Sequence, residues 1–129
     1  MPSFGKSSTE NLSQCHSDLQ LLFNIVVRKF DCSVICGSRT ETEQNRTFLE
    51  GKSTLKYPES FHNLKPSLAV DVCPYPINWQ NHKRFYFFAG YVKHVAESLG
   101  IKIRWGGDWD GDTIIDDQNF NDLPHFELV

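Results

Sequence analysis

The stretch SFHNLKPSLAVDV, residues 60–72, joins a turn-rich segment to a short apolar run. His62 lies in the turn-rich part, and Asp71 lies in the apolar run between two valines. An ionised carboxylate in a buried strand is costly unless it is paired or binds a metal. Near the other end of the chain, residues 122–129 place His125 at the start of a second strand-like run. Two histidines and one carboxylate leave a fourth position open, which is typical of catalytic zinc sites.

Length and composition indicate one folded domain that spans residues 1–129. Hydrophobic residues make up 40% of the chain, which is enough to form a core and argues against disorder. The formal net charge is -3, so the chain lacks the basic excess that is typical of nucleic-acid-binding proteins. Its apolar runs are all interrupted well before the roughly 20 residues that a transmembrane helix needs.

The first residues, 1–6, contain no apolar stretch and therefore do not resemble a secretory signal. The four cysteines are Cys15, Cys32, Cys36 and Cys73, and they form no C-x-x-C pair. Cysteines usually stay reduced in a protein that is made without an export signal. We therefore expect free, mostly buried thiols, with a disulfide set as the alternative.

Hydrophobic periodicity predicts three helices and four strands. A capping-box pattern at Ser7 and Glu10 precedes apolar residues at three- and four-residue steps, which predicts a first helix over residues 7–29. The other predicted elements are helices at 42–50 and 81–99 and strands at 32–37, 68–73, 101–105 and 124–128.

Two further polar features are candidates for function. Arg39 follows the strand predicted at 32–37, and a guanidinium at a strand end can hold a carboxylate or a developing oxyanion. An exposed loop position is the simpler interpretation of this arginine. Residues 108–117 combine acidic residues with glycine and could bind Ca²⁺, although they lack the complete ligand spacing of an EF-hand. A solvated acidic loop is the simpler interpretation of that stretch.

Six segments are similar to motifs of peptidase family M15. In chain order they are FGKS (4–7), GSRT (37–40), SFH (60–62), AVD (69–71), GGDW (106–109) and DLPHFEL (122–128). The chain resembles in particular the phage endolysin L-alanyl-D-glutamate peptidases, which are related to D-Ala-D-Ala dipeptidases and carboxypeptidases. This resemblance covers nearly the whole chain. It implies an α+β zinc peptidase fold of the M15/Hedgehog type, in which three helices pack on a small antiparallel sheet.

The resemblance also implies roles for individual residues. The ligands of a single catalytic Zn²⁺ would be His62, Asp71 and His125, with water in the fourth position. Asp122 lies where the family has its catalytic base, and Arg39 lies where the family has an arginine that holds the substrate carbonyl and its oxyanion. Glu127 matches a family glutamate with a structural role or a contact to a metal ligand. Eight residues separate His62 from Asp71, where many members have six, so this loop is longer here.

The implied function is zinc-dependent hydrolysis of the peptidoglycan stem peptide between L-Ala and D-Glu by a monomeric, bacteriolytic endolysin. Two alternatives stay open: a D,D-carboxypeptidase or D-Ala-D-Ala dipeptidase, and a catalytically silent domain that binds zinc and cell walls. Because we see neither an export signal nor a separate wall-binding domain, we expect synthesis in the cytoplasm, holin-dependent release and action at the cell wall. No nucleic-acid partner is expected.

Overall fold

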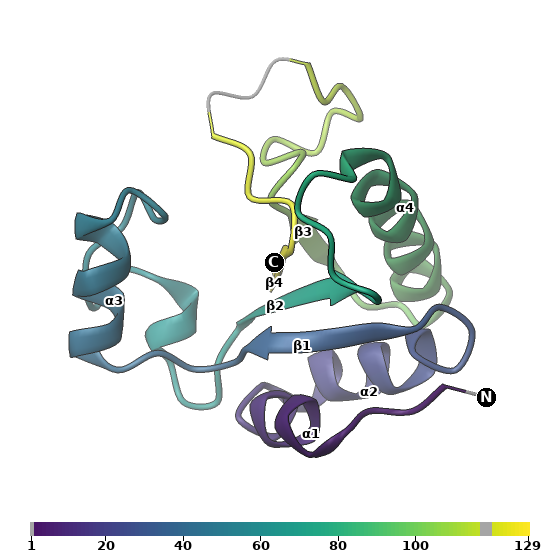
Figure 1. The fold of residues 1–129 in the computed structure, drawn as a ribbon, viewed down its shortest axis with the longest axis horizontal. Helices are drawn as coiled ribbons and strands as arrows, with labels where there is room; N and C mark the ends of the chain where they lie inside the picture. The colour runs from purple at the N-terminus through teal and green to yellow at the C-terminus, as the bar shows by residue number, and fades with distance from the viewer. Residues whose placement is uncertain (1, 117–119) are drawn as a thin grey trace.

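The computed structural model describes residues 2–116 and 120–129. Its helices are α1 (Lys6–Ser13), α2 (Ser17–Val26), α3 (Glu41–Leu49) and α4 (His82–Ser98), with a short 3-10 helix, η1, at Phe61–Asn63. Its strands are β1 (Cys32–Cys36), β2 (Ala69–Pro74), β3 (Ile103–Trp105) and β4 (His125–Leu128), as Figure 1 shows. The predicted α+β class is confirmed. All four predicted strands and the two later helices lie within two residues of their expected bounds.

The four strands form one antiparallel sheet in the order β1-β2-β4-β3. Because residues that pair across an antiparallel ladder share a face, the register decides which side chains lie together. Asp71 pairs with Cys36 on one side and with His125 on the other. Arg104 pairs with Glu127, which lies two residues after His125 on the same strand. One face of the sheet therefore carries a row of polar side chains that crosses all four strands.

The opposite face of the sheet is apolar and packs against helices. Its side chains include Val34, Val70, Val72, Trp105 and Phe126. They belong to the same buried cluster as the apolar stripes of α1, α2 and α4. Phe126 is completely buried and packs edge-on against Phe23 of α2 and Phe88 of α4, at ring-centroid distances of 5.4 and 6.1 Å. Burial of this apolar face fixes the register of the strands. Because side chains alternate along a strand, the same register places the polar residues on the opposite face of the sheet.

The segment expected as one helix over residues 7–29 forms α1 and α2 instead, so the described residues contain four α-helices where three were predicted. Backbone bonds to a distant loop cause the break. The Ser67 N–H donates to the Gln14 carbonyl and the His16 N–H donates to the Ser67 carbonyl, both at 2.9 Å. His16 then caps α2, because its Nδ1 accepts the Asp18 N–H at 3.0 Å.

The capping boxes also differ from the prediction. Helix α1 begins at Lys6 with Gly5 as its N-cap and has no side-chain cap bond, so the capping box expected at Ser7 is wrong. A complete capping box begins α3 instead. Thr40 accepts the Glu43 N–H at 3.2 Å, and the Glu43 carboxylate accepts the Thr40 N–H at 2.9 Å. This cap fixes the direction of the chain directly after Arg39.

The four cysteines are free thiols, as predicted, and three of them are buried. Burial raises the pKa of Cys15, Cys32 and Cys73 to about 12 in each case, so these thiols stay protonated and unreactive at neutral pH. No helix within the described residues has the length and apolar character needed to cross a membrane.

Candidate metal centre and active site

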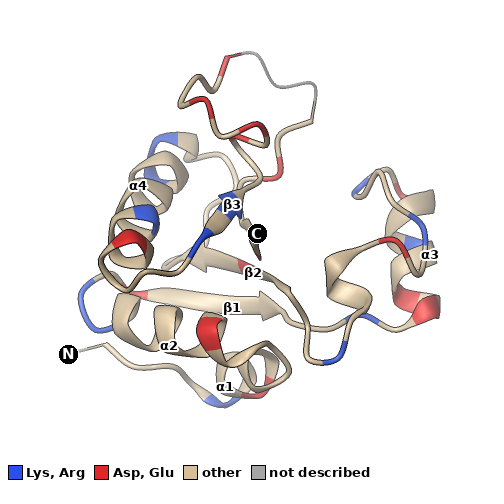
Figure 2. Cartoon of the chain, turned by 180° about the vertical axis from the view of Figure 1, so that it is seen from behind, with Lys and Arg blue, Asp and Glu red and all other residues tan. Residues whose placement is uncertain are grey.

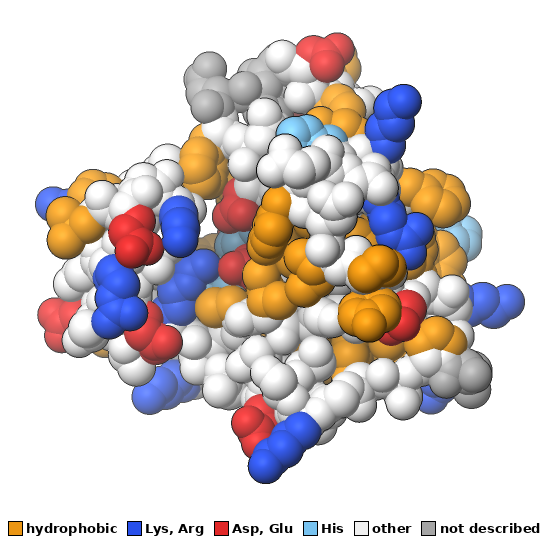
Figure 3. All heavy atoms as spheres, in the orientation of Figure 1, with side chains coloured by type: hydrophobic (Ala, Val, Ile, Leu, Met, Phe, Trp, Pro, Cys, Tyr) orange, Lys and Arg blue, Asp and Glu red, His pale blue; other side chains and the backbone are white. Residues whose placement is uncertain are grey.

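The polar face of the sheet opens into two cavities with volumes of about 600 and 720 Å³. His62, His125 and Glu127 line the first cavity, and Asp71 and Asp122 line the second. The arginine after β1 lines both, so the two cavities adjoin. In Figure 3 a hollow between α3 and the body of the molecule exposes acidic, basic and histidine side chains at its floor.

Three of the predicted site residues bring candidate metal-ligand atoms together in a tight triangle, the ligand triangle. His62 Nε2, His125 Nδ1 and Asp71 Oδ1 lie 3.3 Å from one another along all three edges. All three residues are buried. A tetrahedral zinc ion with bonds of about 2.0–2.1 Å separates its ligand atoms by about 3.3 Å, so the triangle has the size that such an ion requires.

The hydrogen bonds on the outer side of each imidazole fix its tautomer. His62 Nδ1 lies 2.6 Å from the Gly37 carbonyl oxygen, and His125 Nε2 lies 2.7 Å from the Glu127 carboxylate. Both partners are acceptors, so these two nitrogens carry protons, and in their neutral, metal-binding form the rings turn lone pairs toward Asp71. Asp71 Oδ1 is itself buried without a hydrogen-bond partner. Three acceptor atoms thus face one point, an arrangement that suits a cation or added protons.

The charges around the triangle shift its pKa values strongly. Burial alone would lower the pKa of both histidines, but the Asp71 carboxylate more than offsets that effect and raises the pKa of His62 to about 10. Asp71 and Glu127 together raise the pKa of His125 to about 9. Burial opposes ionisation of Asp71, yet the two histidines hold its pKa well below the usual range. The centre therefore favours an anionic carboxylate with positive charge beside it.

Arg39 is held in place beside the triangle. Its Nη2 donates to Asp71 Oδ2 and its Nη1 donates to Gln44 Oε1, both at 3.1 Å. Gln44 is completely buried and donates in turn to the Leu55 carbonyl at 2.7 Å, which locks its amide. Sequence reasoning missed Gln44, because a glutamine on a short polar helix gives no signal of burial. The exposed-loop interpretation of Arg39 does not describe this partly buried, bonded guanidinium, whose side chain is 15% exposed.

Asp122 lies at the edge of the triangle, with Oδ2 3.8 Å from His125 Nδ1. Its backbone N–H donates to the Gly106 carbonyl at 2.9 Å, and its own carbonyl accepts the His125 N–H at 3.1 Å. A Cβ atom at Gly106 would come within 2.0 Å of the Asp122 carbonyl oxygen, so this close approach requires glycine. Burial, followed by the charge of Asp71, raises the pKa of Asp122 to about 6. The carboxylate is therefore mostly ionised at neutral pH and basic enough to accept a proton.

Two overlapping groups of side chains at this centre could hold a metal ion. They are Cys36 with His62 and Asp71, and Asp71 with Asp122 and His125. Cys36 was not expected near the centre. Its sulfur lies 3.9 Å from His62 Nδ1, the nitrogen that bonds to Gly37, and within 4.8 Å of an Asp71 carboxylate oxygen.

A separate acidic cluster follows β3. Asp108, Asp110 and Asp112 each bring one carboxylate oxygen within 4.8 Å of the others. Figure 2 shows the acidic segments of this loop, on the side of the molecule that carries β3. Asp108 is only 3% exposed, and its Oδ1 is buried without a hydrogen-bond partner, while its Oδ2 accepts the Thr113 N–H at 2.9 Å. Position 117, the last residue of the predicted Ca²⁺ loop, lies outside the described residues.

Comparisons with known proteins give this geometry a context. A family model described as phage L-alanyl-D-glutamate peptidase matches residues 2–129. The chain is 28% identical over 134 residues to the L-alanyl-D-glutamate peptidase of Escherichia phage T5, covering 98% of this chain and 97% of the phage protein. The crystal structure of the Serratia marcescens L-Ala D-Glu endopeptidase ChiX superposes with a TM-score of 0.77 at 28% identity, covering 99% of this chain and 91% of that one. The chain therefore belongs to the phage L-alanyl-D-glutamate peptidase family.

Proposed function

We propose that this peptidase hydrolyses the bond between L-Ala and D-Glu in the peptidoglycan stem peptide and that it requires one Zn²⁺ ion. The proposed ligands are His62, Asp71 and His125. The triangle of 3.3 Å edges, with a buried Asp71 oxygen that accepts no hydrogen bond at one corner, is the observation that carries this proposal. Family membership supports the peptidase activity and the wall substrate.

A bound zinc ion would supply Lewis acidity, which lowers the pKa of a coordinated water toward about 7 and polarises a substrate carbonyl. Asp122 would accept the proton of the attacking water and deliver it to the leaving amine. Arg39 lines both cavities and would stabilise the negative charge on the carbonyl oxygen. Its bonds to Asp71 and Gln44 hold the guanidinium before substrate arrives.

Glu127 would orient His125 rather than contact the substrate bond. Its 2.7 Å contact to Nε2 keeps the ring proton on the outer nitrogen and makes the inner nitrogen a better ligand. All the proposed ligands and both cavities come from one chain, so we propose that the peptidase acts as a monomer. Its substrate would place its action at the bacterial cell wall.

The alternative enzyme function is removal or release of terminal D-alanine. Mass spectrometry of digested muropeptides separates the two activities, because cleavage between L-Ala and D-Glu creates a new amino-terminal D-Glu and the alternative releases D-Ala. A protein that binds zinc and cell walls but creates no new amino groups in the peptidoglycan would instead favour the catalytically silent domain.

We also propose that the acidic cluster after β3 binds Ca²⁺. The cluster offers three carboxylates at alternating positions, and the buried, unpartnered Asp108 Oδ1 is the specific observation that favours a cation there. Hard oxygen ligands suit Ca²⁺ rather than Zn²⁺. Because Trp109 lies between two of these acids and its ring centroid is 5.2 Å from that of His125, a cation here could influence the active-site wall.

A further inference from the structure

Arg104 lies at the end of the row of polar side chains that begins at the ligand triangle. Its Nη1 donates to Glu127 Oε2 at 3.2 Å, and the other oxygen of Glu127 accepts from His125 Nε2 at 2.7 Å. The antiparallel pairing of β3 with β4 places Arg104 directly opposite Glu127 on the same face of the sheet. Arg104 therefore contacts the carboxylate that in turn contacts a proposed metal ligand.

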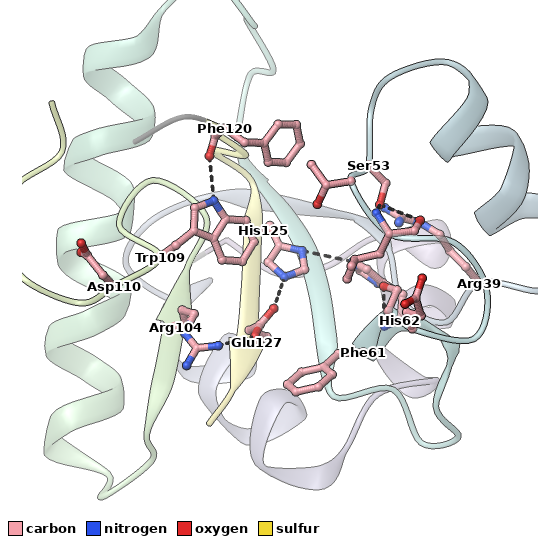
Figure 4. Close-up of a pocket in the computed structure, with 14 residues that line it drawn as sticks. Arg39, Ser53, Phe61, His62, Arg104, Trp109, Asp110, Phe120, His125 and Glu127 are labelled. Carbon is pink, nitrogen blue, oxygen red and sulfur yellow. Dashed lines mark hydrogen bonds and ion pairs between the residues drawn. The ribbon is translucent and has the colours of Figure 1, made fainter. Parts of the chain in front are cut away.

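The guanidinium has donors left for a ligand. Among the described residues, Glu127 is its one hydrogen-bond partner, and a guanidinium has five N–H donors. The Arg104 side chain is 41% exposed and lines the same 600 Å³ cavity as the two histidines. Figure 4 shows Arg104 and Arg39 on opposite sides of His125, with Trp109 above Arg104. The cavity therefore presents one arginine at each end of the reacting centre.

The two arginines are not equivalent. Arg39 is 15% exposed and already bonded to Asp71 and Gln44, whereas Arg104 is much more open to the cavity. Of the acidic residues in the cavity wall, Glu127 is paired with Arg104, Glu59 accepts the Lys56 N–H at 3.4 Å and Asp110 accepts the Asp112 N–H at 3.2 Å. Of the two arginines that line this cavity within the described part of the chain, Arg104 is therefore the more accessible.

We propose that Arg104 is a specificity residue that binds the free α-carboxylate of the D-glutamate after the cleaved bond, an inference that rests on the proposed function. In the stem peptide D-Glu is linked onward through its γ-carboxyl group, so its α-carboxylate stays free and lies within a few bonds of the scissile carbonyl. Arginine is suited to such a planar anion because its fork can donate two parallel N–H···O bonds to one carboxylate, and Glu127 engages only Nη1. Peptidoglycan in which this carboxylate is amidated would lack the recognised charge.

A purely structural role of Arg104 predicts a different pattern. If Arg104 only holds Glu127 and through it His125, its loss must slow the cleavage of every substrate by the same factor. Recognition of the α-carboxylate predicts a loss confined to substrates that carry it. The two roles are therefore separated by combining one enzyme variant with two substrates.

The experiment measures kcat and KM for the zinc-loaded enzyme on disaccharide tripeptides that contain either D-Glu or its α-amide, D-isoglutamine. The wild type should prefer the free acid by about 10- to 100-fold in kcat/KM, mainly through KM, since that is the range of one charge-assisted hydrogen bond. Arg104→Gln should remove this preference, and Arg104→Lys should restore part of it. Lys102→Gln is the matched control. It removes the same charge two residues away, and Lys102 lines a different cavity from the one that contains Arg104.

Three results would overturn the proposal: a wild type that cleaves both substrates equally well, an Arg104→Gln variant that keeps the preference, and a Lys102→Gln variant that loses it. If the wild type cleaves neither substrate between L-Ala and D-Glu, the proposed function itself fails, which is a distinguishable outcome.

Discussion

Asp71 and His125 are register partners in the β2–β4 ladder, and Asp71 Oδ1 lies 3.3 Å from His125 Nδ1. Their neighbours Val70 and Phe126 pair in the same ladder and are completely buried in the core. A slip of one residue would turn the carboxylate and the imidazole toward the apolar helices and turn the apolar pair away from the core. The packing that stabilises the sheet therefore also assembles the proposed metal centre.

Replacing a proposed ligand should have a different effect from replacing the proposed base. We expect His62→Ala, Asp71→Ala and His125→Ala to lose zinc, measured as metal bound per chain after dialysis. Asp122→Asn should keep the zinc and the thermal unfolding temperature while kcat falls by about 10²- to 10⁴-fold, the usual range for loss of a general base.

The matched control for the base is Asp18→Asn, because Asp18 is an exposed aspartate on α2, away from both cavities. This variant should keep full activity. Full activity of Asp122→Asn would show that another group accepts the proton.

Zinc uptake should release protons. The pKa values of His62 and His125 are raised to about 10 and about 9, so both imidazoles are protonated at pH 7 before metal binds. A zinc ligand must be a neutral imidazole, and binding at pH 7 should therefore release about two protons. Apparent affinity should rise with pH until the solution passes these pKa values. Calorimetric titration in buffers of different ionisation enthalpy measures the protons directly, and a binding enthalpy independent of the buffer would contradict the assignment.

Gly106→Ala should lower activity although Gly106 contacts no substrate in this account. The added Cβ would lie 2.0 Å from the Asp122 carbonyl oxygen, so the backbone of the base must shift. We expect kcat/KM to fall by about 10- to 100-fold, since small displacements of catalytic groups have effects of this size. Gly90→Ala is the control: it meets no atom within 4 Å in helix α4, and it should keep activity while stabilising the fold by about 0.5–1 kcal/mol. Equal activity of the two variants would show that Gly106 does not position Asp122.

The acidic cluster should bind Ca²⁺ in a manner that depends on its carboxylates. Calcium titration followed by tryptophan fluorescence, to which Trp109 within the cluster contributes, should give a saturable change in the wild type, and Asp110→Asn should weaken the binding by about tenfold or more. Asp18→Asn should bind as the wild type does. An unchanged titration in Asp110→Asn would argue for a solvated acidic loop.

Much of the fold follows from local patterns in the sequence. The strand that holds Asp71 is a short apolar run with one polar residue, and the strand that begins at His125 alternates polar and apolar residues, so the sequence predicts both. The break between α1 and α2 was missed because it depends on backbone bonds from Ser67, a residue far along the chain. Periodicity reports which face of a helix is buried and says little about competition from such distant partners.

The site residues also divide into those that the sequence could predict and those that it could not. The ligand triangle could be proposed from the resemblance because its three residues lie in recognisable motifs. Gln44 and Arg104 could not, since their roles depend on tertiary neighbours: Gln44 becomes important through its bond to Arg39, and Arg104 through its pairing with Glu127.

The most direct test of the central claim joins metal analysis to a muropeptide digest. The protein is stripped of metal, one portion is reloaded with Zn²⁺, and both portions are incubated with purified peptidoglycan before mass spectrometry of the products. We predict one zinc per chain in the reloaded protein and new amino-terminal D-Glu in that sample only. Equal release of D-Glu by the stripped protein, or release of D-Ala in place of new D-Glu termini, would contradict the account.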